Sequence, residues 1–142
     1  MKIGFTGTQK GMTQLQRFKF VGVLSKINKE KIIKEFHHGQ CIGADAQAHS
    51  LVTFYYSAKI YSHRPINTTK KFTMVYDNET IFLCEPKPYL QRNKDIVDET
   101  DLLIACPNTK KEVLRSGTWS TVRYARKRKK EVLIIYPDGK CG

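Results

Sequence analysis

Two short segments rich in glycine and hydroxyl side chains carry the strongest chemical signal in this sequence. They are residues 4–13 (GFTGTQKGMT) and 115–121 (RSGTWST), and each joins an apolar, strand-like run to an amphipathic, helix-like run. Small residues let backbone N–H groups approach a bound anion, and a helix N-terminus adds about half a positive charge at the same point. The two segments therefore predict two adjoining helix starts that bind the phosphate of a small molecule.

A third segment, residues 37–49, collects three histidines and one aspartate. Asp45 and His49 are four residues apart and share one face of a helix, whereas the neighbours His37 and His38 point to opposite sides of a strand. The segment does not complete a tetrahedral ligand set, so we expect no metal here. We expect these side chains to form hydrogen bonds to a ribose or base instead. The first segment has neither the GxGxxG nor the P-loop spacing, and its glycines alone are also typical of a tight turn.

Strand-like and helix-like runs alternate along the chain. Strands are predicted at 2–5, 35–38, 59–63, 102–106 and 132–136, and helices at 44–57, 89–99 and 118–130, with a first helix that begins at the capping box of Thr13 and Gln16. Residues 64–88 are irregular, are typical of a binding loop and can hold a short strand at 80–83. This order predicts an α/β fold, a three-layer Rossmann-like domain whose five-stranded parallel sheet has helices on both faces. Ligands of such sheets bind outside the carboxyl ends of the strands.

Composition predicts one globular domain over residues 1–142. The chain is 40% hydrophobic and 27% charged, and from its residues we expect neither a signal peptide nor a membrane span. Its four cysteines have no metal-ligand spacing, which favours a reduced, cytoplasmic protein with no membrane partner.

The net charge of +12 predicts an anionic partner. A basic cluster at 123–130 closes the last predicted helix, where cations complement the helix dipole. This cluster has two interpretations, a solvated helix end and a nucleic-acid surface. The former is favoured because aromatic residues do not alternate with the basic ones.

Five short blocks occur in a fixed order over nearly the whole chain. They are Phe5-Thr6-Gly7-Thr8, His38-Gly39-x-x-x-Gly43-Ala44-Asp45, Tyr89-x-x-Arg92-Asn93, Asp101-x-x-Ile104-Ala105-x-Pro107 and Ser116-Gly117-Thr118-Trp119. Together they resemble the SLOG superfamily of Rossmann-like nucleotide binders, which includes the DprA/Smf domain, the YspA-like proteins and the LOG (lysine decarboxylase-like) phosphoribohydrolases. Small stand-alone YspA-like members from bacteria and phages are the most similar in pattern.

The resemblance implies a five-stranded parallel sheet and a pocket for a nucleotide or nucleotide-derived molecule, such as an ADP-ribose-like or cyclic nucleotide signal that the protein senses or sequesters. It also implies a homo-oligomer, and no cofactor is expected. Arg92 and Arg115 are the expected phosphate partners, because a guanidinium offers a planar fork of donors. The candidate ligand- and phosphate-binding residues are Gly7, Thr8, Gln9, His38, Gly43, Ala44, Asp45, Arg92, Asn93, Arg115, Ser116, Gly117 and Thr118.

One departure from the phosphoribohydrolase pattern favours a binding protein over an enzyme. In that branch an acidic residue follows the Gly-Thr turn, whereas Trp119, Ser120 and Thr121 follow it here, and Trp119 is expected to pack in the core rather than stack on a base. Cleavage of an N-glycosidic bond needs a carboxylate. Asp45 is the remaining candidate for an N-glycosidase or transferase, although it can equally brace its helix. A single-stranded nucleic-acid binding module is the third alternative.

Overall fold

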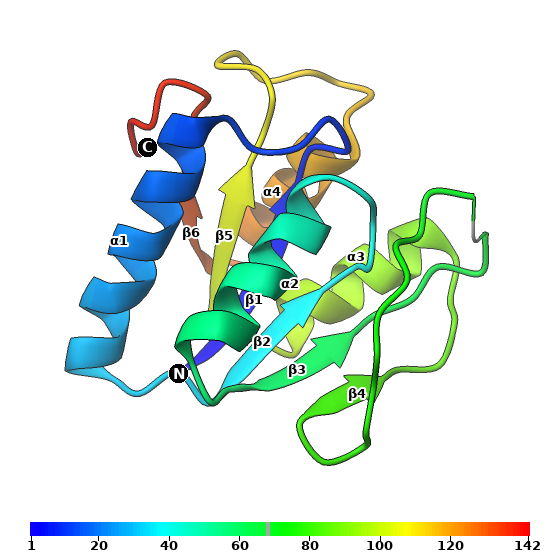
Figure 1. Ribbon diagram of the computed structural model, residues 1–142. Helices are drawn as coiled ribbons and strands as arrows, with labels where there is room; N and C mark the ends of the chain where they lie inside the picture. Colours follow the sequence, from blue (N-terminus) through cyan, green and yellow to red (C-terminus); the bar gives the residue numbers. More distant parts are fainter. Residues whose placement is uncertain (68) are drawn as a thin grey trace.

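The computed structural model describes residues 1–67 and 69–142; residue 68, inside the predicted loop 64–88, lies outside the described residues. Four helices accompany the strands in the described part of the chain (Figure 1). The helices are α1 (Gln14–Glu30), α2 (Ala44–Tyr55), α3 (Tyr89–Asp98) and α4 (Gly117–Lys127). The strands are β1 (Lys2–Gly7), β2 (Glu35–His38), β3 (Lys59–Ser62), β4 (Ile81–Leu83), β5 (Leu102–Cys106) and β6 (Glu131–Ile134).

The strands form one sheet in the order β4-β3-β2-β1-β5-β6, and every pair is parallel. The α/β class is confirmed, but the prediction of five strands is wrong, because the described residues form six. The additional strand, β4, lies at the edge of the sheet, where Ile81 pairs with Ile60 of β3. It has three residues, all half-buried, and a segment this short has too few alternations to be distinguished from a loop.

The helices cover both faces of the sheet, so the fold has three layers (Figure 1). Under α1 and α2, the rings of Phe5, Phe20 and Phe36 form the centre of one apolar cluster, with centroids 5.3–6.2 Å apart. Under α3 and α4, a second cluster contains Ile96 and Trp119. Strand β5 (LLIAC) is buried along its whole length, as expected for a central parallel strand covered on both faces.

Helix α1 begins at the predicted capping box. The side chain of Thr13 accepts a hydrogen bond from the Gln16 N–H, and the Gln16 side chain accepts one from the Thr13 N–H. The amide nitrogen of Gln16 also donates to the carbonyl oxygens of Pro107 and Ile135, at 2.7 and 2.9 Å. The start of α1 is therefore bound to the loops that follow β5 and β6.

The order of the strands reverses at β1. From β1 the chain adds β2, β3 and β4 on one side, and then crosses to add β5 and β6 on the other side. The loops that follow β1 and β5 consequently lead to helices on opposite faces, and a crevice opens between their carboxyl ends. No helix of the described residues is both long and apolar enough to cross a membrane.

Candidate functional site

A cleft of about 690 Å³ lies at the carboxyl ends of β1 and β5. Its walls are the loop after β1, the turn between β2 and α2, the first turns of α3 and α4, and part of the segment between β3 and β4. This is the position at which doubly wound sheets bind ligands, and the volume falls within the range of small-molecule sites.

Most of the candidate residues predicted from the sequence meet in this cleft. They come from four segments of the chain, and three further candidates, His38, Gly43 and Ala44, are not among the residues that line it. The predicted residues on the cleft wall are Gly7, Thr8, Gln9, Asp45, Arg92, Asn93, Arg115, Ser116, Gly117 and Thr118.

The three candidates outside the cleft support its walls from behind. His38 is fully buried; its Nδ1 accepts a hydrogen bond from the Gln40 N–H, and its Nε2 lies 3.0 Å from Nδ1 of His49. The Ala44 N–H donates to the Thr8 carbonyl at 2.9 Å. Gly43 has φ +85°, and a Cβ there would collide with the backbone of Gln9, so only glycine fits this turn. These residues hold the turn before α2 against the loop after β1.

Helix α4 presents its N-terminus to the cleft, whereas α1 does not. The Ser116 side chain accepts a hydrogen bond from the Trp119 N–H at 3.2 Å, and the amides of Gly117 and Thr118 belong to the first turn, which has no intrahelical acceptors. Thr13 and Gln16 occupy the start of α1 and do not line the cleft. Of the two helix starts that were predicted to adjoin the ligand, the start of α4 lines the cleft and the start of α1 does not. The start of α4 faces the loop after β1 instead.

Arg92 is the most unusual side chain of the cleft, because it is a buried cation with incomplete pairing. It is 5% exposed, and its Nη1 donates to the carbonyl oxygens of Gly39 and His63. Within the described part of the chain, Nε has no hydrogen-bond partner and the guanidinium forms no ion pair. A Cβ on Gly39 would overlap the guanidinium, so glycine is required beside it. Its guanidinium carbon lies 5.0 Å from the ring centroid of Tyr89.

Asp45 braces the turn that precedes α2. Its Oδ2 accepts hydrogen bonds from the N–H groups of Gly39 and Cys41, at 3.0 and 3.2 Å. Burial raises the pKa of Asp45 to about 6, while the Arg92 charge and the two backbone donors oppose that rise. The Gly39 peptide is thus fixed on both sides, with its N–H on Asp45 and its carbonyl on Arg92.

Cations outnumber acids around the cleft. Arg92 is joined by Lys10, Lys70 and Arg115, all three exposed, and Asp45 is the one acidic residue among the described residues that line the walls. Such an arrangement attracts an anion from solution. The cleft can therefore hold a phosphate group by charge and by the amides of α4 together.

The segment between β3 and β4 contributes three wall residues that no sequence motif marked. This segment docks on the β2–α2 turn through two backbone bonds, Ile42 N–H to Lys70 carbonyl at 2.9 Å and Phe72 N–H to Gln40 carbonyl at 3.0 Å. It brings Asn67, Thr69 and Lys70 to the cleft wall. Its length and prolines predicted a binding loop, but no motif marked these three residues.

Trp119 and Glu112, on either side of the Gly-Thr turn, lie away from the ligand position. Trp119 is 3% exposed in the core under α4, and its Nε1 donates to Thr109 Oγ1 at 3.0 Å, which confirms the packing role. Glu112 pairs with Arg123 at 3.0 Å on the surface. Neither supplies the carboxylate that follows the Gly-Thr turn in the phosphoribohydrolases.

Comparison with known proteins shows the fold alone. No protein-family model matches the sequence, and no curated protein matches it. Among solved structures, the chain is similar to the molybdenum cofactor binding protein from the phototrophic bacterium Rippkaea orientalis. That similarity has a TM-score of 0.65 at 20% sequence identity, and it covers 96% of this chain and 77% of that chain. The shared feature is the α/β architecture that places the cleft.

Proposed function

We propose that the cleft binds a nucleotide or nucleotide-derived small molecule, whose phosphate lies between the first turn of α4 and Arg92. The observation that carries this proposal is the state of Arg92. Among the described residues it has no carboxylate partner and its Nε has no acceptor, although the side chain is 95% buried. A buried charge with no carboxylate in direct contact is costly. A phosphate bound in the cleft places a negative charge beside this guanidinium.

The other groups around this position fit the same ligand. The first-turn amides of Gly117 and Thr118 offer donors and a favourable dipole. Lys10, Lys70 and Arg115 surround the open side of the cleft and attract a polyanion. The remaining volume accommodates a sugar and base, and the amide side chain of Asn93 can hydrogen-bond to them.

The chemistry of the cleft favours a binder over an enzyme, so we propose a sensor or sequestering protein for a nucleotide-derived signal. Asp45, the one carboxylate among the described wall residues, is already bound to two backbone N–H groups. A small-molecule ligand is also supported by the similar fold, since the Rippkaea orientalis protein is named for binding a cofactor. Membership of the SLOG superfamily is part of this proposal, and it rests on the ordered sequence blocks.

The test is calorimetric titration of the full chain with AMP, ADP-ribose and cyclic AMP, with adenosine as the control that lacks phosphate. We expect adenosine to bind at least tenfold more weakly than AMP, because it leaves Arg92 unpaired. Arg115→Ala should weaken AMP binding up to about tenfold, whereas Arg17→Ala, at an exposed arginine of α1, should not change it. Equal affinity for adenosine and AMP would refute the phosphate position. Mass spectrometry of molecules that co-purify with the protein would then identify the natural ligand.

The nucleic-acid alternative receives less support from the structure. Part of the basic surface at 123–130 is neutralised, because Arg123 and Arg126 pair with Glu112 and Arg128 pairs with Asp98. If the protein is nevertheless a nucleic-acid binder, its affinity for a single strand must fall steeply with salt. That affinity must also fall when Arg126, Lys127 and Lys129 are replaced together.

A further inference from the structure

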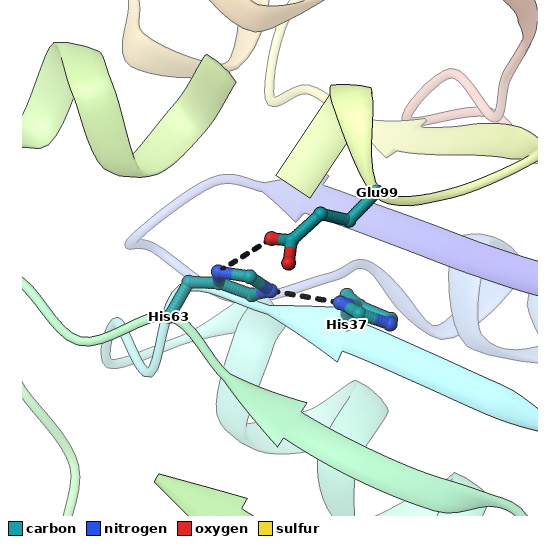
Figure 2. A group of neighbouring side chains, drawn as sticks. All are labelled: His37, His63 and Glu99. Carbon is teal, nitrogen blue, oxygen red and sulfur yellow. Dashed lines mark hydrogen bonds and ion pairs between the residues drawn. The ribbon is translucent and has the colours of Figure 1, made fainter. Parts of the chain in front are cut away.

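A cluster of two histidines and one glutamate lies outside the cleft, on the side of the sheet covered by α3 (Figure 2). His37 belongs to β2, His63 directly follows β3, and Glu99 ends α3. Nδ1 of His37 is 2.7 Å from Nε2 of His63, and Nδ1 of His63 is 3.5 Å from a carboxylate oxygen of Glu99. One nitrogen of each ring and one oxygen of Glu99 all lie within 4.8 Å of one another.

The contacts of this cluster leave a place for one positive charge between Nδ1 of His63 and the Glu99 carboxylate. Nε2 of His37 is 2.8 Å from the Glu35 carboxylate, so Nε2 carries the hydrogen and Nδ1 is an acceptor. Nε2 of His63 must then donate to it, which leaves the lone pair of Nδ1 directed at the Glu99 carboxylate. Two acceptors that face each other repel.

We propose that a divalent transition-metal ion of the Zn²⁺ type supplies this charge, bound by His37, His63 and Glu99. Two imidazole nitrogens and one carboxylate oxygen form a ligand set that suits Zn²⁺ better than Mg²⁺ or Ca²⁺. The contact between Glu35 and Nε2 of His37 is the outer-shell carboxylate that commonly orients a metal-binding histidine. Three protein ligands leave the fourth tetrahedral position for water.

Binding of one ion by all three residues requires the His63 ring to turn and Glu99 to approach (Figure 2). Ligand atoms on one tetrahedral Zn²⁺ are about 3.3 Å apart, because each bond is about 2.0–2.1 Å. The three ligand atoms lie within 4.8 Å of one another, but the two nitrogens of His63 face different partners, Nε2 facing His37 and Nδ1 facing Glu99. The Glu99 side chain is 55% exposed and can follow the ion. Two surface hollows, one lined by His63 and Glu99 and the other by His37 and Glu99, give access from solvent.

The opposite face of β2 provides an internal comparison. His38 and His49 also place two ring nitrogens 3.0 Å apart. Within the described residues, however, no third metal-ligating side chain accompanies that pair. A metal that simply prefers paired histidines would bind at either place, whereas the proposed site depends on Glu99.

The experiment uses the full chain, stripped of metal with a chelator. Co²⁺ serves as the spectroscopic probe, and Zn²⁺ affinity is measured by competition with it. We expect one equivalent of Co²⁺ to bind with the visible absorption of a four-coordinate N/O site. Glu99→Gln should weaken binding at least tenfold, while Glu30→Gln, at the exposed end of α1, and His49→Gln should keep wild-type affinity.

Stability separates loss of the site from loss of the fold. An amide at position 99 can donate to Nδ1 of His63, so metal-free Glu99→Gln should melt at or above the wild-type temperature. Zn²⁺ should raise the melting temperature of the wild type and leave that of Glu99→Gln unchanged. The proposal is overturned if the stripped protein takes up no equivalent of Co²⁺ or Zn²⁺. It is equally overturned if Glu99→Gln binds as tightly as the wild type, or if His49→Gln is the variant that loses the metal.

Discussion

Gly117→Asp should stabilise the fold but weaken nucleotide binding. The new carboxylate favours the start of α4 and repels a phosphate bound there. Gly117 is the first residue of α4, and a Cβ built on it meets no heavy atom within 4 Å. Aspartate replaces the poorest helix former other than proline and places a negative charge at the positive end of the helix dipole. Together these effects should increase the free energy of unfolding by about 1 kcal/mol.

The same carboxylate would occupy the space that we assign to the ligand phosphate. Two unit charges about 5 Å apart repel by about 2–3 kcal/mol at the effective dielectric constant of a partly exposed protein site. This corresponds to a loss of about 30- to 150-fold in affinity for AMP. Adenosine, which has no phosphate, should lose little, so the discrimination between the two compounds should largely disappear.

The assay pairs calorimetric titration of AMP with unfolding by urea. Gly22→Asp is the matched control, because Gly22 is an exposed glycine of α1 with equally open space around its Cα. It should leave AMP binding unchanged, and Gly117→Ala should retain affinity within about threefold, since alanine adds bulk without charge. If Gly117→Asp folds and binds AMP as the wild type does, the phosphate does not lie at the start of α4 and the reasoning fails.

Three further predictions concern Asp45 in the cleft and Thr13 and Trp119 outside it. In the folded protein the pKa of Asp45 is about 6, against an ordinary value of 3.8. The stability that this raised pKa contributes is therefore complete below pH 3.8 and is lost as the pH rises through 6. Urea unfolding from pH 3.5 to 7 should show the wild type losing about 3 kcal/mol relative to Asp45→Asn. Thr13→Ala removes half of the capping box and should cost about 1 kcal/mol in urea unfolding, without changing AMP affinity, because α1 starts outside the cleft. Trp119→Phe loses the bond to Thr109 and should cost about 1–2 kcal/mol, again with AMP affinity unchanged in calorimetry; a loss of binding would instead indicate base stacking.

The fold was largely predictable because its signals are local. The apolar run at β5, the capping box at Thr13 and the alternation of strands and helices each depend on neighbouring residues. Strand β4 matches the short strand that segment 64–88 was expected to hold at 80–83, but it was not counted in the predicted five-stranded sheet. Its three half-buried residues become a strand through pairing with β3, and that pairing is a tertiary contact that periodicity does not record.

The site was predictable where a segment leads directly into the cleft, and less so where contacts are distant. Ser116, Gly117 and Thr118 line the cleft. Gly43 was predicted as a ligand-binding residue too, but glycine is required there because the backbone of Gln9 lies too close for a Cβ. The histidine–glutamate cluster combines residues 37, 63 and 99, so spacing within one segment contains no trace of it. Arg92 was predicted as a phosphate partner, yet its burial with an unpaired Nε is visible only in the structure.

The remaining choice, between a binder and an N-glycosidase, depends on one carboxylate. Asp45 is mostly ionised at neutral pH, as a base must be, but its Oδ2 already accepts hydrogen bonds from two backbone N–H groups. Withdrawing it for proton transfer would release the turn that also holds Arg92. We therefore expect no free base when the protein is incubated with nucleoside monophosphates and the mixture is separated by chromatography. Release of base by the wild type, abolished by Asp45→Asn while AMP binding persists, would make the protein an enzyme that uses this carboxylate.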